Sequence, residues 1–191
     1  LNKLQEATAI LQFKLESQLI KRRPDFQLEH RDVLHFIDFS EKTIKLGTEV
    51  YELTDFQAPT VNPEQPESLT AEEEKIISHL LNNFRSSDKL KRHVEFLQEK
   101  GAMYLSYNGN LLIHGCLPLH ENGDFKSFTV NKEAHAGRDL LDFFDQEVRK
   151  CLAHPENSTD LATDLMWYLW VGECSSLFGK TAMTTFERYN I

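Results

Sequence analysis

The chain has 191 residues, of which 40% are hydrophobic and 27% are charged, as in a folded globular protein. Its formal net charge of -9 argues against a nucleic-acid partner, because a phosphate backbone needs clustered Lys and Arg. No apolar run approaches the roughly 20 residues of a membrane span, so we expect no membrane contact. Three cysteines without CxxC spacing indicate neither a disulfide framework nor a thiolate zinc site. We therefore expect a reducing, cytoplasmic location.

Apolar residues recur at helical spacing from Leu4 to Leu19, which predicts an amphipathic helix. The helix is expected to end before Pro24, because proline disfavours helical geometry in the preceding residue. Lys21, Arg22 and Arg23 fall in its last turn, where cations complement the helix dipole. We interpret them as a solvated helix end, with a phosphate contact as the alternative.

The period changes between His30 and Leu53. Val33, His35 and Ile37 alternate with other residues, and two further short runs flank Gly47, which predicts a small antiparallel meander. Residues 56–68 contain three prolines and are expected to form a loop.

Thr70 and Glu73 have the spacing of a capping box, which predicts a helix beginning there. Residues 86–88 interrupt the helical pattern, and a second helix is expected to end at Gly101. The charged residues 91–93 on this helix are interpreted as solvent-exposed.

Asn108–Gly109 between two apolar runs predicts a tight β-hairpin, since both residues tolerate positive φ. The outgoing strand 111–113 is apolar at three successive positions, so we expect it to be buried on both faces. It leads directly to His114 and Gly115. An imidazole at a rigid strand end, next to a glycine that permits close approach, suits a metal ligand. The alternative is a hydrogen-bonded core histidine.

Asn122–Gly123 predicts another tight turn, followed by a strand over 125–130. A helix is expected to open at Gly137 or Arg138 and to end at 154–155. Asp160 is expected to cap a last helix. We interpret the aromatic residues of that helix, including Trp167 and Trp170, as core residues in preference to a ligand cage. Residues 172–179 are expected to form a loop.

Residues 113–118, Ile-His-Gly-Cys-Leu-Pro, resemble the strand-end element of the calcineurin-like metallophosphatases, in which the His binds one of two bridged metals. Asp164–Trp167 resembles the Asp-Leu-Leu-Trp element of that superfamily. Over nearly the whole chain, the sequence resembles the class III, Firmicutes-type fructose-1,6-bisphosphatases. The runs that carry this resemblance occur in the family's order, at residues 13–18, 21–24, 107–118, 167–170, 176–180 and 183–189.

The resemblance implies an α/β fold with an α+β appearance in this chain, which would be part of a four-layer metallophosphatase sandwich. Residues 1–100 would be a family-specific helical and small β-meander insertion, and residues 101–191 a partial catalytic core. The chain starts at Leu1 without Met, and we expect an internal fragment. The helices of the insertion are an expected place for contacts in a homo-oligomer.

The resemblance further implies hydrolysis of the 1-phosphate of fructose 1,6-bisphosphate in gluconeogenesis, with a divalent metal, manganese being expected. His114 would be a metal ligand, and Lys180 and Arg188 would bind one sugar phosphate, as a point charge and a guanidinium fork. In the alternative interpretation, Arg188 pairs with Glu187 or another acidic residue and holds the loop.

The superfamily's other metal motifs do not occur in this sequence, so we expect the isolated chain to be inactive and its catalytic residues to lie elsewhere. Cys116 stands where the protein phosphatases have Gly, which argues against that class. Two rival interpretations remain: a metallophosphoesterase for another substrate, and a non-catalytic interaction module in which His114 is structural.

Overall fold

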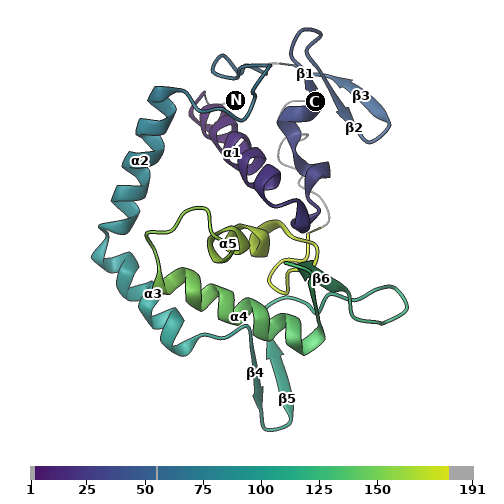
Figure 1. The fold of residues 1–191 in the computed structure, drawn as a ribbon, viewed down its shortest axis with the longest axis vertical. Coiled ribbons are helices and arrows are strands. Elements are labelled where there is room, and N and C mark those ends of the chain that lie inside the picture. The colour runs from purple at the N-terminus through teal and green to yellow at the C-terminus, as the bar shows by residue number, and fades with distance from the viewer. Residues whose placement is uncertain (1–2, 55, 181–191) are drawn as a thin grey trace. The chain divides into compact units, whose positions relative to one another are not determined.

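The computed structural model describes residues 3–54 and 56–180, which fall into two compact units. The first unit contains the described residues up to Leu80, and the second contains those from Leu81 onward. Within the described residues there are five α-helices and three small antiparallel sheets (Figure 1), which confirms the expected α+β appearance. The assignment of residues 1–100 to an insertion and 101–191 to a catalytic core stays a prediction.

The first unit begins with α1 (Lys3–Arg22), which ends before Pro24 as predicted. Three short 3-10 helices follow, at Pro24–Phe26, Glu29–Arg31 and Val33–Phe36. The strand predicted from alternation at Val33 and His35 is therefore wrong. The His35 N–H donates to the Asp32 carbonyl at 3.0 Å, and the His35 ring lies 2.9 Å from the Asp32 carboxylate. These local contacts favour a tight turn over an extended strand.

The predicted antiparallel meander is confirmed for the three strands that follow. These are β1 (Ile37–Asp38), β2 (Thr43–Leu46) and β3 (Glu49–Glu52). Ile44 in the central strand is fully buried and pairs with Ile37 on one side and Tyr51 on the other. It packs in a small core with Leu34 and Leu53. Burial of this one face fixes the register of the sheet.

α2 (Ala71–Arg85) begins with the predicted capping box. The Glu73 N–H donates to Thr70 Oγ1 at 3.2 Å, and the Thr70 N–H donates to Glu73 Oε2 at 2.7 Å. Lys14 of α1, which is wholly buried, donates from Nζ to the same Glu73 oxygen at 2.7 Å. A buried ion pair therefore links α1 to the first turn of α2 within the first unit.

The second unit contains α3 (Asp88–Lys100), whose N-terminus is capped by the Ser87 hydroxyl, which accepts from the Leu90 N–H at 3.4 Å. The predicted hairpin is confirmed as β4 (Tyr104–Tyr107) and β5 (Asn110–Ile113). The two residues between the strands have positive φ, at 50° for Asn108 and 74° for Gly109.

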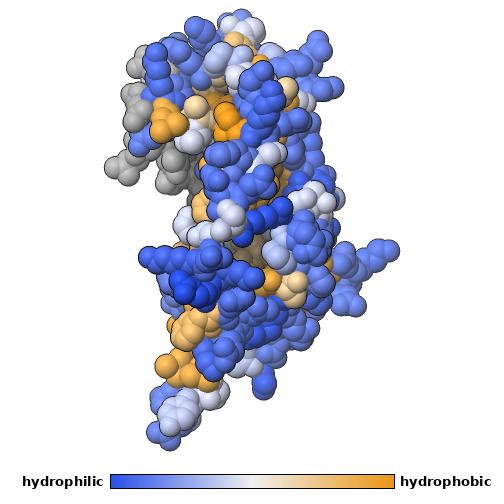
Figure 2. All heavy atoms as spheres, turned by 90° about the vertical axis from the view of Figure 1, so that its left-hand side faces the viewer, coloured by the Kyte–Doolittle hydropathy of each residue, from blue (hydrophilic) through white to orange (hydrophobic). Residues whose placement is uncertain are grey.

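The expectation that the outgoing strand of this hairpin is buried on both faces is wrong. Leu111 is 53% exposed and Leu112 is 51% exposed. In the described part of the chain, β4 and β5 form a sheet of their own, and all of their side chains except those of Tyr104 and Ile113 are exposed. Figure 2 shows apolar side chains gathered over this hairpin at the lower end of the view.

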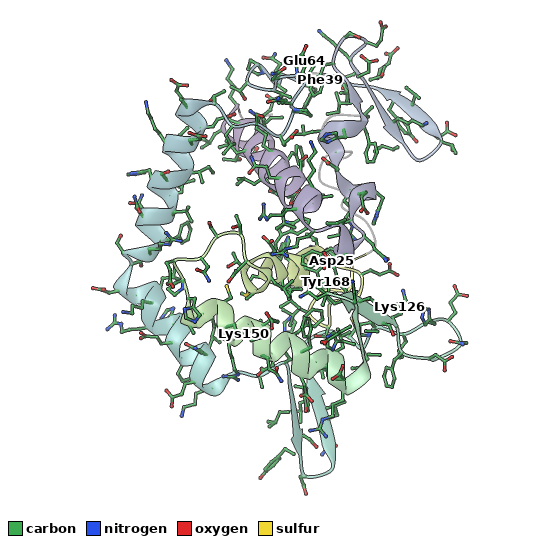
Figure 3. All side chains as sticks on the ribbon, in the orientation of Figure 1. Asp25, Phe39, Glu64, Lys126, Lys150 and Tyr168 are labelled. Carbon is green, nitrogen blue, oxygen red and sulfur yellow. The ribbon has the colours of Figure 1, made fainter. Side chains whose placement is uncertain are left out.

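The core of the second unit lies between a second hairpin and two helices. The hairpin joins β6 (Ser127–Val130) to β7 (Glu133–Ala136), and the helices are α4 (Gly137–Ala153) and α5 (Leu161–Val171). The Phe128 ring lies 4.4 Å from the ring of Tyr168, which Figure 3 labels on α5, and 5.7 Å from the ring of Phe144. These three buried rings join the strands to both helices. The cap of α5 is confirmed, because Asp160 accepts from the Thr163 N–H at 2.9 Å.

Every helix within residues 3–54 and 56–180 is too short or too polar to cross a lipid bilayer.

Candidate functional site

The backbone after β5 is held against the loop that follows α5. The Cys116 N–H donates to the Ser176 carbonyl at 3.0 Å. A Cβ on Gly115 would lie 2.4 Å from the Leu177 carbonyl oxygen and 2.7 Å from that of Ser176. Glycine is therefore required beside His114 because two backbone segments meet there. His114 itself is exposed to solvent, so the interpretation as a buried core histidine is wrong for this structure.

Ser175 organises the loop on the other side of this contact. Its buried hydroxyl donates to the Leu169 carbonyl at 2.6 Å and accepts from the N–H groups of Leu177 and Phe178 at 3.1 and 3.4 Å. One side chain thus connects the end of α5 to the backbone that carries Phe178. The neighbouring Ser176 hydroxyl is also buried, but it has no hydrogen-bond partner among the described residues.

Phe178 brings two predicted site residues together. Its ring centroid lies 6.1 Å from that of His114, at an interplanar angle of 70°, and 4.7 Å from that of Trp170, at 66°. Lys180 Nζ lies 4.1 Å from the Trp170 centroid and 5.3 Å from the Phe178 centroid. We call His114, Trp170, Phe178 and Lys180 the Phe178 cluster. The second predicted phosphate-binding residue, Arg188, lies outside the described residues.

Trp170 was predicted to pack in the core, and this is wrong, because the side chain is 50% exposed. The inward face of α5 is formed instead by residues such as Leu165, Tyr168 and Leu169, all of which are buried. Sequence reasoning missed Trp170 and Phe178 as site residues. An aromatic residue next to the buried positions of an apolar helix gives no signal of its own exposure.

The described residues do not fit a complete metal centre. Among them, no three His, Cys, Asp or Glu side chains converge on a point where a metal ion would sit. Stable sites for divalent ions need several such donors. His114 offers one exposed imidazole, whose ring lies next to that of Phe178.

Two further groups set the charge around the loop after α5. The Glu173 carboxylate accepts a hydrogen bond from Lys126 and raises the pKa of that ammonium above its usual value, so the pair is charged at neutral pH. Figure 3 labels Lys126 just before β6. Burial raises the pKa of the Cys174 thiol, which keeps it protonated and a poor nucleophile.

A groove of about 660 Å³ lies along β7, α4 and the start of α5. Four of its five acidic residues have partners, for example Asp139, whose carboxylate lies 2.7 Å from the His135 ring, and Asp160, which caps α5. The His135 ring stacks on Phe143 at 4.1 Å. The polar lining of this groove therefore serves the packing of the unit.

Comparison with known proteins agrees with the resemblance seen in the sequence. The chain belongs to the Firmicute fructose-1,6-bisphosphatase family, whose model matches residues 1–191. A relative named fructose-1,6-bisphosphatase class 3 from Lactococcus lactis subsp. cremoris is 85% identical over all 191 residues. Relatives with the same name from Streptococcus agalactiae and Bacillus velezensis are 52% and 51% identical over the whole chain.

The chain spans about 30% of the length of these curated relatives. No solved structure matches it.

Proposed function

We propose that the whole protein hydrolyses the 1-phosphate of fructose 1,6-bisphosphate to fructose 6-phosphate and inorganic phosphate, in the cytoplasm and as a step of gluconeogenesis. The relatives' names support this substrate. The observation that carries the role of this chain is the Phe178 cluster, which gathers His114 and Lys180 from segments 66 positions apart in the printed sequence.

His114 is proposed as one ligand of a divalent metal, with manganese as the expected ion. Its ring is exposed at the end of β5, and the Gly115 contact with the loop carbonyls keeps the backbone beneath it in place. The other ligands of that metal lie outside the described residues. A divalent ion in such a site would neutralise charge on phosphoryl oxygens.

Lys180 is proposed to meet the charge of a sugar phosphate, together with Arg188. The chain as a whole carries a formal net charge of -9, so its overall field does not attract a phosphorylated metabolite. A phosphate must instead be met by a cation close to it. The Lys180 ammonium over the Trp170 and Phe178 rings supplies such a cation in the described part of the chain.

The test is phosphate release by the purified whole protein with manganese, from fructose 1,6-bisphosphate and from a panel of other phosphate monoesters. His114→Asn is expected to lower kcat by at least about 100-fold, as loss of a metal-supporting group does. His120→Asn is the matched control, since it changes an exposed histidine in the same unit. Equal activity of His114→Asn and wild type would refute the metal role. Preference for another monoester would refute the substrate assignment.

A further inference from the structure

The most unusual feature of the Phe178 cluster is the ammonium group over an exposed indole. Lys180 Nζ lies 4.1 Å from the Trp170 centroid, well within cation–π range. Trp170 projects from the last turn of α5 and is half exposed, although its neighbour Leu169 is buried. The indole therefore contributes little to the core and presents a face to the lysine.

We infer that Trp170 is a positioning residue, which holds the Lys180 ammonium for a phosphate group of a sugar phosphate ester. The inference rests on the proposed function for the choice of substrate. Trp170 does not itself contact the reacting atoms. It acts through Lys180, whose long flexible side chain would otherwise sample many rotamers.

The chemistry of the two groups makes this arrangement suitable for an anion. An aromatic face attracts an ammonium through the ring quadrupole and supplies no acceptor oxygen. The ammonium group has three N–H donors that rotate freely about the Cε–Nζ bond. The contact with the indole does not itself remove the charge of the ammonium. Pre-positioning lowers the entropy lost when an anion binds.

Phe178 relates this lysine to the end of β5. The centroid of its ring lies 5.3 Å from Lys180 Nζ and 6.1 Å from the centroid of the His114 ring. The Ser175 hydroxyl binds the backbone N–H of Phe178 and so restrains the ring that both groups touch. Lys180 and His114 therefore share Phe178 as a neighbour.

The kinetic test compares Trp170→Leu with Trp170→Phe in the whole protein. Loss of a partly exposed cation–π contact corresponds to about a three- to five-fold change in affinity. We expect the KM for fructose 1,6-bisphosphate to rise by about that factor in Trp170→Leu, with kcat unchanged. Trp170→Phe should recover most of the loss. Tyr107→Leu, which removes an exposed aromatic ring from the β4–β5 hairpin, should leave KM unaltered.

A spectroscopic test does not depend on turnover. In whole protein carrying lysine labelled with ¹³C at Cε, the Lys180 signal, assigned by its absence in Lys180→Arg, should be shifted upfield by the indole ring current. Inorganic phosphate should move this signal in wild type, and Trp170→Leu should abolish the upfield shift and weaken the response to phosphate.

The two tests separate this inference from the proposed function. A Lys180 signal without an upfield shift, one that ignores phosphate, or an unchanged KM in Trp170→Leu would overturn the positioning role. A protein that fails to hydrolyse fructose 1,6-bisphosphate, but whose Lys180 signal still responds to phosphate through Trp170, would overturn only the choice of substrate.

Discussion

Replacing Lys14 by methionine removes the cation from a fully buried ion pair in the first unit. Lys14 Nζ donates at 2.7 Å both to Glu73 Oε2 and to the Thr60 carbonyl oxygen. Methionine keeps the length of the side chain but leaves the Glu73 carboxylate, whose side chain is only 9% exposed, without its countercharge. Breaking one side of a buried pair typically costs about 3–5 kcal/mol. We expect about 3 kcal/mol, since Glu73 keeps its bonds from Thr60 Oγ1 and the Thr70 N–H.

A second substitution tests whether the cost comes from the stranded charge. In Lys14→Met/Glu73→Gln, the amide oxygen still accepts from the Thr70 N–H, but no charge remains buried. The double variant should regain about 2 kcal/mol relative to Lys14→Met alone. Lys21→Met is the matched control on the same helix. Lys21 is 47% exposed in its pair with Glu67, so its loss should cost only about 0–1 kcal/mol.

Hydrogen exchange followed by mass spectrometry in the whole protein is the suitable assay. The units of a large protein need not unfold together, and this method reports the local stability of each peptide separately. The protection of α1 and of the first turn of α2 should fall in Lys14→Met and largely return in the double variant. If Lys14→Met loses no more protection than Lys21→Met, the assignment of a stabilising buried pair is wrong.

The same pair predicts a pH dependence with a definite sign. Burial acts to raise the pKa of Glu73, but the hydrogen bonds from Lys14, Thr60 and the backbone of Thr70 outweigh it and hold the pKa below the usual carboxyl range. A folded-state pKa below that of the unfolded chain gives stability that is complete above about pH 4.3 and is lost as the pH falls through the folded pKa. Glu73→Gln should therefore flatten the acid side of the protection profile, while lowering protection at neutral pH, because the buried Lys14 ammonium loses its countercharge.

Five further substitutions test the second unit. In denaturant unfolding, Ser175→Ala should destabilise the unit by about 2 kcal/mol, because three backbone groups lose a buried partner. Ser176→Ala should be neutral or stabilising by up to about 1 kcal/mol, since its buried hydroxyl has no partner among the described residues. A larger loss of stability in Ser176→Ala than in Ser175→Ala would contradict the assigned bonds. Gly115→Ala should displace His114 and lower kcat of the whole protein, through the clash with two carbonyl oxygens, while Gly109→Asn, at a positive φ that asparagine tolerates, should retain activity. The Arg149 guanidinium binds carbonyl oxygens at the C-terminal end of α3, so Arg149→Ala should cost about 2 kcal/mol. The loss should appear as reduced hydrogen-exchange protection at that end of α3. Unaltered protection there would show that Arg149 does not stabilise it.

Local chemistry made several elements predictable from the sequence. The capping box at Thr70 and Glu73, the Asp160 cap and the Asn108–Gly109 turn depend on residues within four positions of each other, and all three are confirmed. The β6–β7 hairpin was missed for a local reason too. Its turn uses Asn131 and Lys132 at φ 50° and 70°, and lysine is an uncommon residue for that conformation.

Burial was the property that sequence patterns predicted worst. Three successive apolar residues in β5 indicated a strand covered on both faces, yet in the described part of the chain only β4 pairs with it. Trp170 lies in an apolar helix but faces solvent and a lysine. Hydropathy records the preference of a side chain, whereas exposure depends on which other segments reach it.

The sequence by itself determined the family, the helix caps and hairpin turns, and the candidacy of His114 and Lys180, because each depends on residue identity at short spacing. Only the tertiary structure placed His114 and Lys180 on one phenylalanine ring and found a lysine buried beneath α2. Such contacts join positions dozens of residues apart, and no local preference specifies them. They form when whole elements pack against each other. The free energy of the folded state depends on all the groups that this packing removes from water.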